Sequence, residues 1–173
     1  MSHPPKLGRG KDRPRTEVSA YVDAPPERVF EVVSDAWLLP VWVVGATHIR
    51  DVDENWPAPG AVVHHQVGAW PLAISDVTAV VECEAPHRLV LQGRAWPFGE
   101  VYIQLTVEPD GAGSSITMGE APSYGAARLL DNPVQRWLLT RRNRESLARL
   151  RSIVENRRER SVPRPELREE GQR

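Results

Sequence analysis

The sequence predicts a two-layer α+β domain, in which one curved antiparallel sheet packs against a single long helix. Three observations support this fold class. Residues 16–22 alternate between apolar and polar side chains, as a half-buried strand does. Further alternating stretches separated by short turn sequences follow between residues 47 and 120, which is typical of an antiparallel meander. Beyond residue 132 the apolar residues recur every three or four positions, as on one face of a helix, and a meander plus one amphipathic helix forms two layers.

Length and charge limit the possible functions. The chain has 173 residues, the size of one domain, and its 22 Lys+Arg and 23 Asp+Glu give a net charge of -1. Since dedicated nucleic-acid binders usually carry a basic excess, we expect no nucleic-acid partner. No apolar run approaches the ~20 residues of a membrane span, and the N-terminal residues lack the apolar core of a secretion signal. We therefore expect a cytoplasmic protein without stable membrane insertion.

The two ends of the chain differ from its middle. Residues 1–15 combine proline and glycine with five basic side chains and offer almost nothing to bury, which predicts a flexible basic arm. Residues 158–173 mix Arg, Glu and Pro without periodicity, which predicts a disordered tail. The folded domain is expected to occupy residues 16–157.

The first strand is followed by two short helical segments. Pro25 and Pro26 suit the first turn of a helix, where the missing N–H costs little, and Val29, Phe30 and Val33 supply an apolar face. Residues 35–44 are apolar but contain Pro40, which favours a second short helix or helical turn.

About seven strands are expected in the sheet. After the first strand they are residues 47–52, 61–67, 72–84, 88–95, 100–108 and 114–120. Proline- and glycine-containing turns separate them. The long helix follows. Asn132 can cap it, Pro133 can open it, and we expect roughly 20–25 residues with an apolar face. The residues assigned to that face are Trp137, Leu138, Leu147, Leu150, Ile153 and Val154.

A resemblance to a known family rests on three stretches. They are VSAYVDAPPERVFEVVSDAWLLPVW (18–42), VTAVVECEAPHRLVLQGRAWPFGEVYIQLTVEPDGAGSSITMGEAP (77–122) and NPVQRWLLTRRNRESLARL (132–150). They resemble the START-like superfamily, also called SRPBCC or helix-grip, and in particular its polyketide cyclase/dehydrase-like branch. The resemblance implies the helix-grip fold over nearly all of residues 15–157. It implies no single activity, because such proteins include carriers, cyclases, hydrolases and toxins.

Strand alternation identifies the apolar side chains expected to face the helix and a ligand. We assign Leu91, Ile103, Leu105 and Met118 to this face. The strand 72–84 is ambiguous. We orient it with Val77, Ala79, Val81 and Cys83 inward, since the opposite set carries two acidic residues. Val77 and Val81 are therefore also expected to contact the ligand, and Cys83 is expected to be a buried small residue rather than a nucleophile.

Two polar positions on these strands suggest chemistry. His64 and His65 are adjacent, so on a strand they point to opposite faces and cannot chelate one metal ion. One of them is expected to face inward as a hydrogen-bond donor or general base, and we assign His64 a catalytic role and His65 a ligand contact. Since no metal-binding or phosphate-binding motif occurs, we expect no metal site and no cofactor.

Glu120 continues the inward set of Ile116 and Met118 on its strand. A carboxyl group on an apolar face is costly unless it is paired or neutral, and it could then act as a catalytic acid or base. The alternative is that the strand ends near Pro122 and that Glu120 lies at the wet rim, paired with an arginine of the helix. The sequence leaves both interpretations open.

Aromatic side chains are the other hint of a ligand. The chain has six tryptophans, and Trp37 and Trp42 fall in the short-helix region while Trp137 falls on the long helix. In the expected fold these positions surround the mouth of a cavity, together with Tyr124 before the helix and Leu138 on it. Packing inside the domain is the alternative role, and we favour it for Trp137.

Two functions follow, and the sequence does not choose between them. The first is binding or carrying a hydrophobic small molecule, such as a lipid, an acyl chain or an aromatic polyketide, between the sheet and the C-terminal helix. The second is a polyketide cyclase, aromatase or dehydratase activity that uses Glu120 and His64 for proton transfer. An interaction protein is a third possibility. We expect a monomer or a homodimer.

Overall fold

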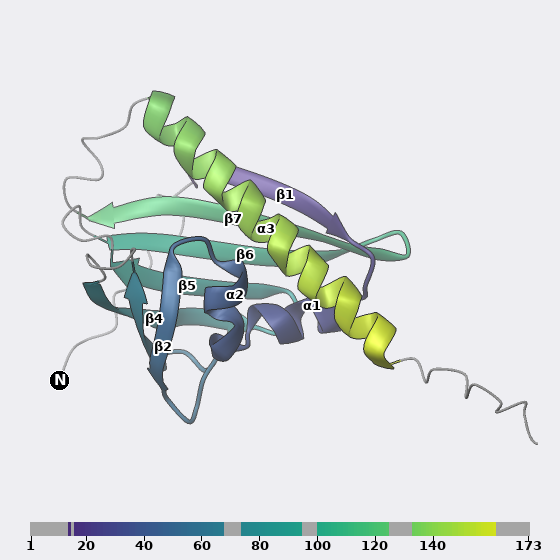
Figure 1. Ribbon diagram of the computed structural model, residues 1–173, viewed down its shortest axis with the longest axis horizontal. Helices are drawn as coiled ribbons and strands as arrows, with labels where there is room; N and C mark the ends of the chain where they lie inside the picture. The colour runs from purple at the N-terminus through teal and green to yellow at the C-terminus, as the bar shows by residue number, and fades with distance from the viewer. Residues whose placement is uncertain (1–13, 15, 68–73, 95–99, 125–132, 162–173) are drawn as a thin grey trace, which may run out of the picture.

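The computed structural model describes residues 14, 16–67, 74–94, 100–124 and 133–161. Within them one antiparallel sheet of seven strands, in the order β1-β7-β6-β5-β4-β3-β2, packs against a long helix (Figure 1). This confirms the predicted α+β helix-grip architecture. Apart from Pro14, the predicted N-terminal arm lies outside the described residues, as do residues 162–173 of the predicted tail. The elements are β1 (Thr16–Val22), α1 (Pro26–Val33), the 3-10 turn η1 (Ala36–Leu38), α2 (Leu39–Trp42), β2 (Ala46–Val52), β3 (Val62–Val67), β4 (Ile74–Glu84), β5 (Arg88–Arg94), β6 (Glu100–Asp110), β7 (Gly113–Tyr124) and α3 (Pro133–Ser161).

The short helices form where the sequence predicts them. Pro26 opens α1, and the buried side chains of this helix include Val29 and Val33, which belong to the hydrophobic core. Asp35 caps η1 by accepting a hydrogen bond of 3.0 Å from the backbone N–H of Trp37. Pro40 lies in the first turn of α2, where a missing N–H breaks no helical bond.

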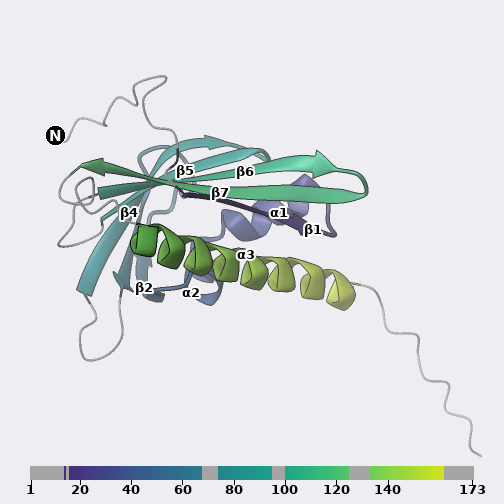
Figure 2. The same ribbon diagram turned by 90° about the horizontal axis from the view of Figure 1, so that it is seen from above.

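The register of the strands defines the face that α3 covers. Residues paired directly across an antiparallel sheet project to the same side. One such row joins Val18, Met118, Leu105 and Leu89, all of which are buried in the core. The next row joins Thr16, Glu120, Ile103 and Leu91. The predicted orientations of these strands are therefore confirmed, and Figure 2 shows α1, α2 and α3 on the same side of the sheet.

The predicted orientation of β4 is wrong for Val77 and Ala79 and right for Cys83. Thr78 and Val80 are buried on the inner face, opposite Val63 and Leu91, so Val77 and Ala79 lie on the outer face. A register shift between Val80 and Glu82 then inserts one extra residue, Val81, and returns Cys83 to the inner face beside Leu89. The sequence suggested strict alternation, and a β-bulge breaks it. Val77 thus lies on the outer face, while Val81 is the bulged residue and has no partner in the register.

Helix α3 has 29 residues, more than the predicted 20–25, and continues to Ser161. Its C-terminal half packs tightly, since Leu147, Leu150 and Val154 are buried in the core. Glu155 also accepts a hydrogen bond of 3.1 Å from the backbone N–H of Asp23, which links this half to the connection between β1 and α1.

The first turns of α3 do not pack as predicted. Figure 1 shows them extending beyond β1 at the edge of the sheet. Trp137 and Leu138 are exposed there, although the sequence assigned both to the buried face of the helix. Despite its length, α3 lacks the apolar run needed to cross a bilayer, and so does every other helix in the described residues.

Candidate functional site

The side chains on the inner face of the sheet are not buried to the same extent along the strands. On β6 the inward side chains Val107 and Leu105 are fully buried, whereas Ile103 and Val101 are only partly buried. The inner side of helix α3 shows the same gradient, from buried Leu150 to half-buried Leu139 near its start. The packing between helix and sheet therefore loosens toward the start of β6. The buried polar residues on this side of the domain are Thr16, His65, Thr78, Glu120, Asn143 and Ser146.

His65 is the inward member of the histidine pair. Along β3 the side chains of Val63 and His65 are buried, while His64 and Gln66 are half-buried on the other face. The Nε2 atom of His65 lies 2.9 Å from the hydroxyl oxygen of Thr78 on β4. Its Nδ1 atom is buried without a hydrogen-bond partner among the described residues. His65 therefore presents a buried ring nitrogen inside the domain, and the backbone of Gln66 lies close enough to its ring to raise its pKa slightly against the effect of burial.

Burial also sets the charge of this imidazole. It lowers the pKa of His65 below 6.5, and the carboxylate of Asp76, directly opposite on β4, partly offsets this effect. The ring is consequently neutral at neutral pH, with one nitrogen as donor and the other as acceptor. The catalytic role predicted for His64 does not fit the structure, because that side chain lies on the opposite face of the sheet from α3.

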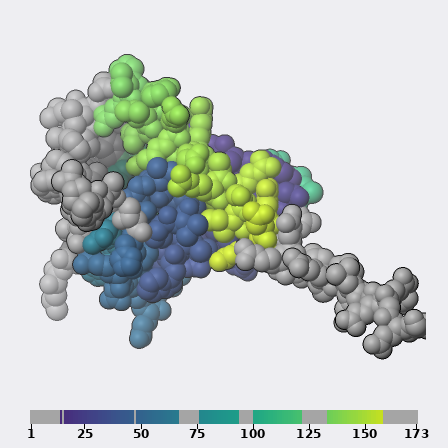
Figure 3. Space-filling model, viewed as in Figure 1, coloured from purple at the N-terminus to yellow at the C-terminus, as the bar shows by residue number. Residues whose placement is uncertain are grey.

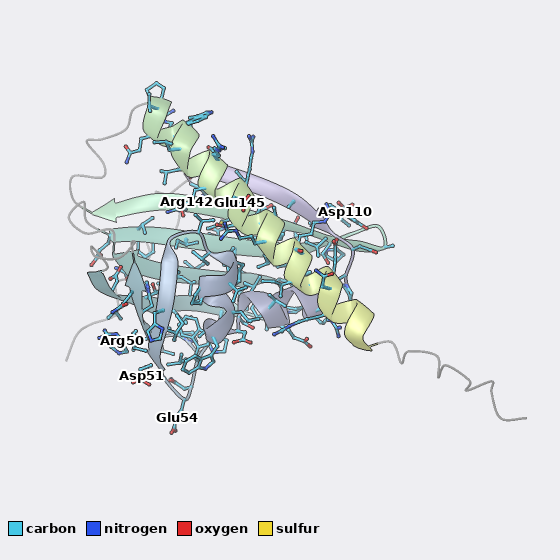
Figure 4. All side chains as sticks on the ribbon, in the orientation of Figure 1. Arg50, Asp51, Glu54, Asp110, Arg142 and Glu145 are labelled. Carbon is cyan, nitrogen blue, oxygen red and sulfur yellow. The ribbon has the colours of Figure 1, made fainter. Side chains whose placement is uncertain are left out.

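Glu120 is buried and paired at the same time. Strand β7 continues to Tyr124, so Glu120 lies inside the strand rather than at its end. Its Oε1 atom accepts a hydrogen bond from Nη2 of Arg142 on α3, at the point where the helix passes over β7 (Figure 4). The sequence left two interpretations open, an inward catalytic carboxyl group and a carboxylate at the rim paired with an arginine. The structure combines them, because Glu120 is buried and is paired with an arginine of the helix. This ion pair connects the helix to the sheet.

Further polar groups surround the ion pair. Arg142 donates two hydrogen bonds to Oδ1 of Asn143, of 3.1 Å from Nε and 3.0 Å from Nη2. The Nδ2 atom of Asn143 has no partner within the described part of the chain, and neither has Oγ1 of Thr16, which stands opposite Glu120 on β1. A buried polar atom without a partner is costly. Both atoms could be satisfied by a polar group of a ligand.

The aromatic residues predicted to surround a cavity mouth differ in their burial. Trp42 is fully buried in the core, so it packs inside the domain. Trp37 is exposed on η1, and Trp137 is exposed with the guanidinium of Arg141 5.7 Å from its ring centre, so the packing role favoured for Trp137 is wrong. The side chain of Tyr124 lies outside the described residues.

The apolar residues predicted to contact a ligand divide into two groups. Leu105 and Met118 are sealed in the core, and Leu91 is nearly so. Ile103 is partly buried beside Glu120 and remains near the looser end of the sheet. The described residues contain no group of three or more His, Cys, Asp or Glu side chains that could hold a metal ion. Burial raises the pKa of Cys83, which disfavours the reactive thiolate.

Comparison with known proteins identifies the family. A family model described as "Polyketide cyclase / dehydrase and lipid transport" matches residues 13–155. The chain belongs to this family. A search of curated protein sequences gave no significant match.

Solved structures share the fold of this family member at low sequence identity. A Rhodobacter sphaeroides protein is 20% identical, with a TM-score of 0.66 over 87% of this chain and 97% of that one. Ara h 8.0201 is 14% identical, with a TM-score of 0.63 over 81% of this chain and 96% of that one. StfQ, a di-domain ARO/CYC of the steffimycin biosynthetic pathway, is 12% identical, with a TM-score of 0.64 over 83% of this chain and 51% of StfQ.

Sequence reasoning missed three polar residues of the site in this family member. Thr78 was placed on the outer face, because the bulge in β4 was not foreseen. Arg142 and Asn143 were not distinguished from the other polar residues of the helix. A signal was present, since Asn143 lies four residues before Leu147 and seven before Leu150, on the buried face of α3.

Proposed function

We propose that this protein binds a hydrophobic small molecule that carries a polar group, such as a lipid, an acyl chain or an aromatic polyketide. The site lies at the looser end of the inner face, around Ile103. The observation that carries the proposal is the combination of loosening apolar packing with buried polar atoms that lack partners. The membership in a family that includes lipid-transport proteins supports it.

Two anchors are available to the polar group of the ligand. His65 offers its Nδ1 atom from β3. On the other side, Asn143 offers an N–H donor beside the Glu120–Arg142 pair. A ligand oxygen that accepts from Asn143 would satisfy this buried donor, while the apolar part of the ligand would gain burial against Ile103.

The first test is native mass spectrometry of the freshly purified protein. A mass excess that disappears on denaturation would show a retained ligand and reveal its class. Binding is then measured as displacement of 1-anilinonaphthalene-8-sulfonate by oleate and by a hydroxylated polyaromatic compound.

The adjacent histidines provide a matched pair of variants for this assay. His65→Leu should weaken binding by about tenfold, because one hydrogen bond to the ligand is lost. His64→Leu changes the same residue type on the outer face and should bind as the wild type does. Ile103→Trp should block the site. Equal affinities for His65→Leu and His64→Leu, or no displacement with the wild type, would contradict the proposal.

A second candidate function is acid–base catalysis of the cyclase, aromatase or dehydratase kind. The neutral, buried imidazole of His65 favours it, because such a ring can accept a proton at neutral pH. The test is turnover of a model polyketone. His65→Gln should lower the rate by about 100-fold or more if the imidazole transfers the proton. An unchanged rate would remove His65 from any mechanism.

A further inference from the structure

The first three turns of α3 carry an apolar stripe on their outer side. Val134, Trp137 and Leu138 are 67%, 58% and 53% exposed. At about 100° per residue, these side chains and Arg141 project within a sector of roughly 100°. The core residues Leu147, Leu150 and Val154 project from a sector centred about 160° away. The exposed stripe is therefore not a frayed continuation of the buried face, and covering the sheet does not explain it.

The charges within the first three turns of α3 have one sign. No Asp or Glu occurs between Pro133 and Arg144, and Arg141 and Arg144 are both exposed. Arg141 lies over the ring of Trp137, 5.7 Å from its centre. The next turns differ, because their outer arginines are neutralised within the helix by the Glu145–Arg149 and Arg151–Glu155 pairs, both 2.9 Å. Arg141 and Arg144 therefore place positive charge beside the exposed apolar side chains.

We infer that the start of α3 docks on the surface of an anionic phospholipid membrane. Helices that lie in a membrane interface combine tryptophan and leucine on one side with flanking arginine, whose guanidinium reaches the phosphates. Tryptophan prefers the boundary between headgroups and acyl chains. Figure 3 shows α3 on the surface of the molecule along its length. The inference rests on this surface alone and does not depend on the proposed ligand site.

A second copy of the chain fits this surface less well. In a two-fold dimer the same patch faces itself, so Arg141 and Arg144 of both copies would be brought together. Like charges in an interface oppose association, whereas anionic phosphates attract these side chains. The charge therefore favours the membrane over self-association.

The experiment is co-sedimentation of the full chain with vesicles of phosphatidylcholine mixed with phosphatidylglycerol, compared with vesicles of phosphatidylcholine alone. The wild type should sediment with the mixed vesicles and be released by high salt. Trp137→Ala should weaken binding by about tenfold, because a large apolar side chain no longer enters the interface. Arg144→Glu should weaken it as well.

Trp37→Ala is the matched control, because Trp37 is a similarly exposed tryptophan (61%) on a different element, η1. It should bind the mixed vesicles as the wild type does. A wild type that stays in the supernatant would overturn the inference, as would equal binding by Trp137→Ala and the wild type. A dimer in light scattering that Trp137→Ala dissolves would assign the stripe to a second copy and overturn it too. The probe-displacement assay contains no vesicles, so its result is independent of this one.

Discussion

The apolar side chains of the two halves of helix α3 point to opposite sides: those of the C-terminal half face the core, and those of the first turns face outward. In the C-terminal half Leu147, Leu150 and Val154 point into the domain and are buried with β1 and α1. In the first turns Val134, Trp137 and Leu138 point outward and are exposed. Arg142 marks the transition, because it lies between the two sets and pairs with buried Glu120. One helix therefore provides a closed core at one end and an accessible surface at the other.

The stability of this domain and its proposed functions therefore reside in different regions. The closed end consists mainly of apolar side chains in the core. The looser end holds the buried polar groups His65, Thr78, Glu120 and Asn143, which cost free energy unless they are satisfied. Changes at the closed end should therefore affect folding, while changes at the looser end should mainly affect binding.

The largest expected effect comes from comparing two leucines of α3. Leu150→Ala should lower the free energy of unfolding by about 2–5 kcal/mol, since it leaves a cavity in the core. Leu138→Ala should change it by less than about 0.5 kcal/mol, because this side chain is exposed. Urea denaturation followed by circular dichroism measures both. Similar losses would show that the first turns of α3 also pack in solution.

Substitutions of Glu120 and Arg142 measure how much this ion pair contributes to the free energy of unfolding. Arg142→Met should lower the free energy of unfolding by about 1–3 kcal/mol, because it leaves the buried carboxylate of Glu120 without its cation. Glu120→Gln combined with Arg142→Met should recover part of this loss. A double-mutant cycle by urea denaturation measures the coupling. Additive effects of the two substitutions would mean that the pair contributes no coupling energy.

The pH dependence of stability reports on His65. Because burial holds its folded-state pKa below 6.5, the unfolded chain takes up this proton first as the pH falls. The free energy of unfolding should therefore decrease as the pH drops below about 6.5, down to the lowered pKa of the folded state. His65→Gln should flatten this part of the curve relative to the wild type, and His64→Gln should not. Denaturation midpoints between neutral and mildly acidic pH test the difference.

The smallest effect is expected on the outer face of the helix. Arg149→Ala breaks the exposed i,i+4 pair with Glu145 and should cost less than about 0.5 kcal/mol. This contrasts with Arg142, whose partner is buried. A loss as large as that of Arg142→Met would show that exposure does not distinguish the two ion pairs. The same denaturation assay applies.

Much of the fold could be predicted from local patterns. The alternation on β5, β6 and β7 identified the inward faces, because a half-buried strand must separate apolar from polar side chains. Two features of the strands were not predicted. The bulge in β4 reversed the orientation of Thr78 and Val77, and β7 ran past Glu120 to Tyr124. Both depend on the partner strands, which a single segment does not specify.

The element order, the long helix and the opposite orientations of His64 and His65 follow from the sequence alone, since backbone periodicity specifies them. Only the packed domain shows which histidine faces inward, that Arg142 is the partner of Glu120, and that Trp42 is buried while Trp137 is exposed. Burial and pairing depend on the residues that lie across the sheet and under the helix, and these come from distant parts of the chain. Residues such as Glu120 and Arg142, 22 positions apart, meet only when α3 is laid over β7.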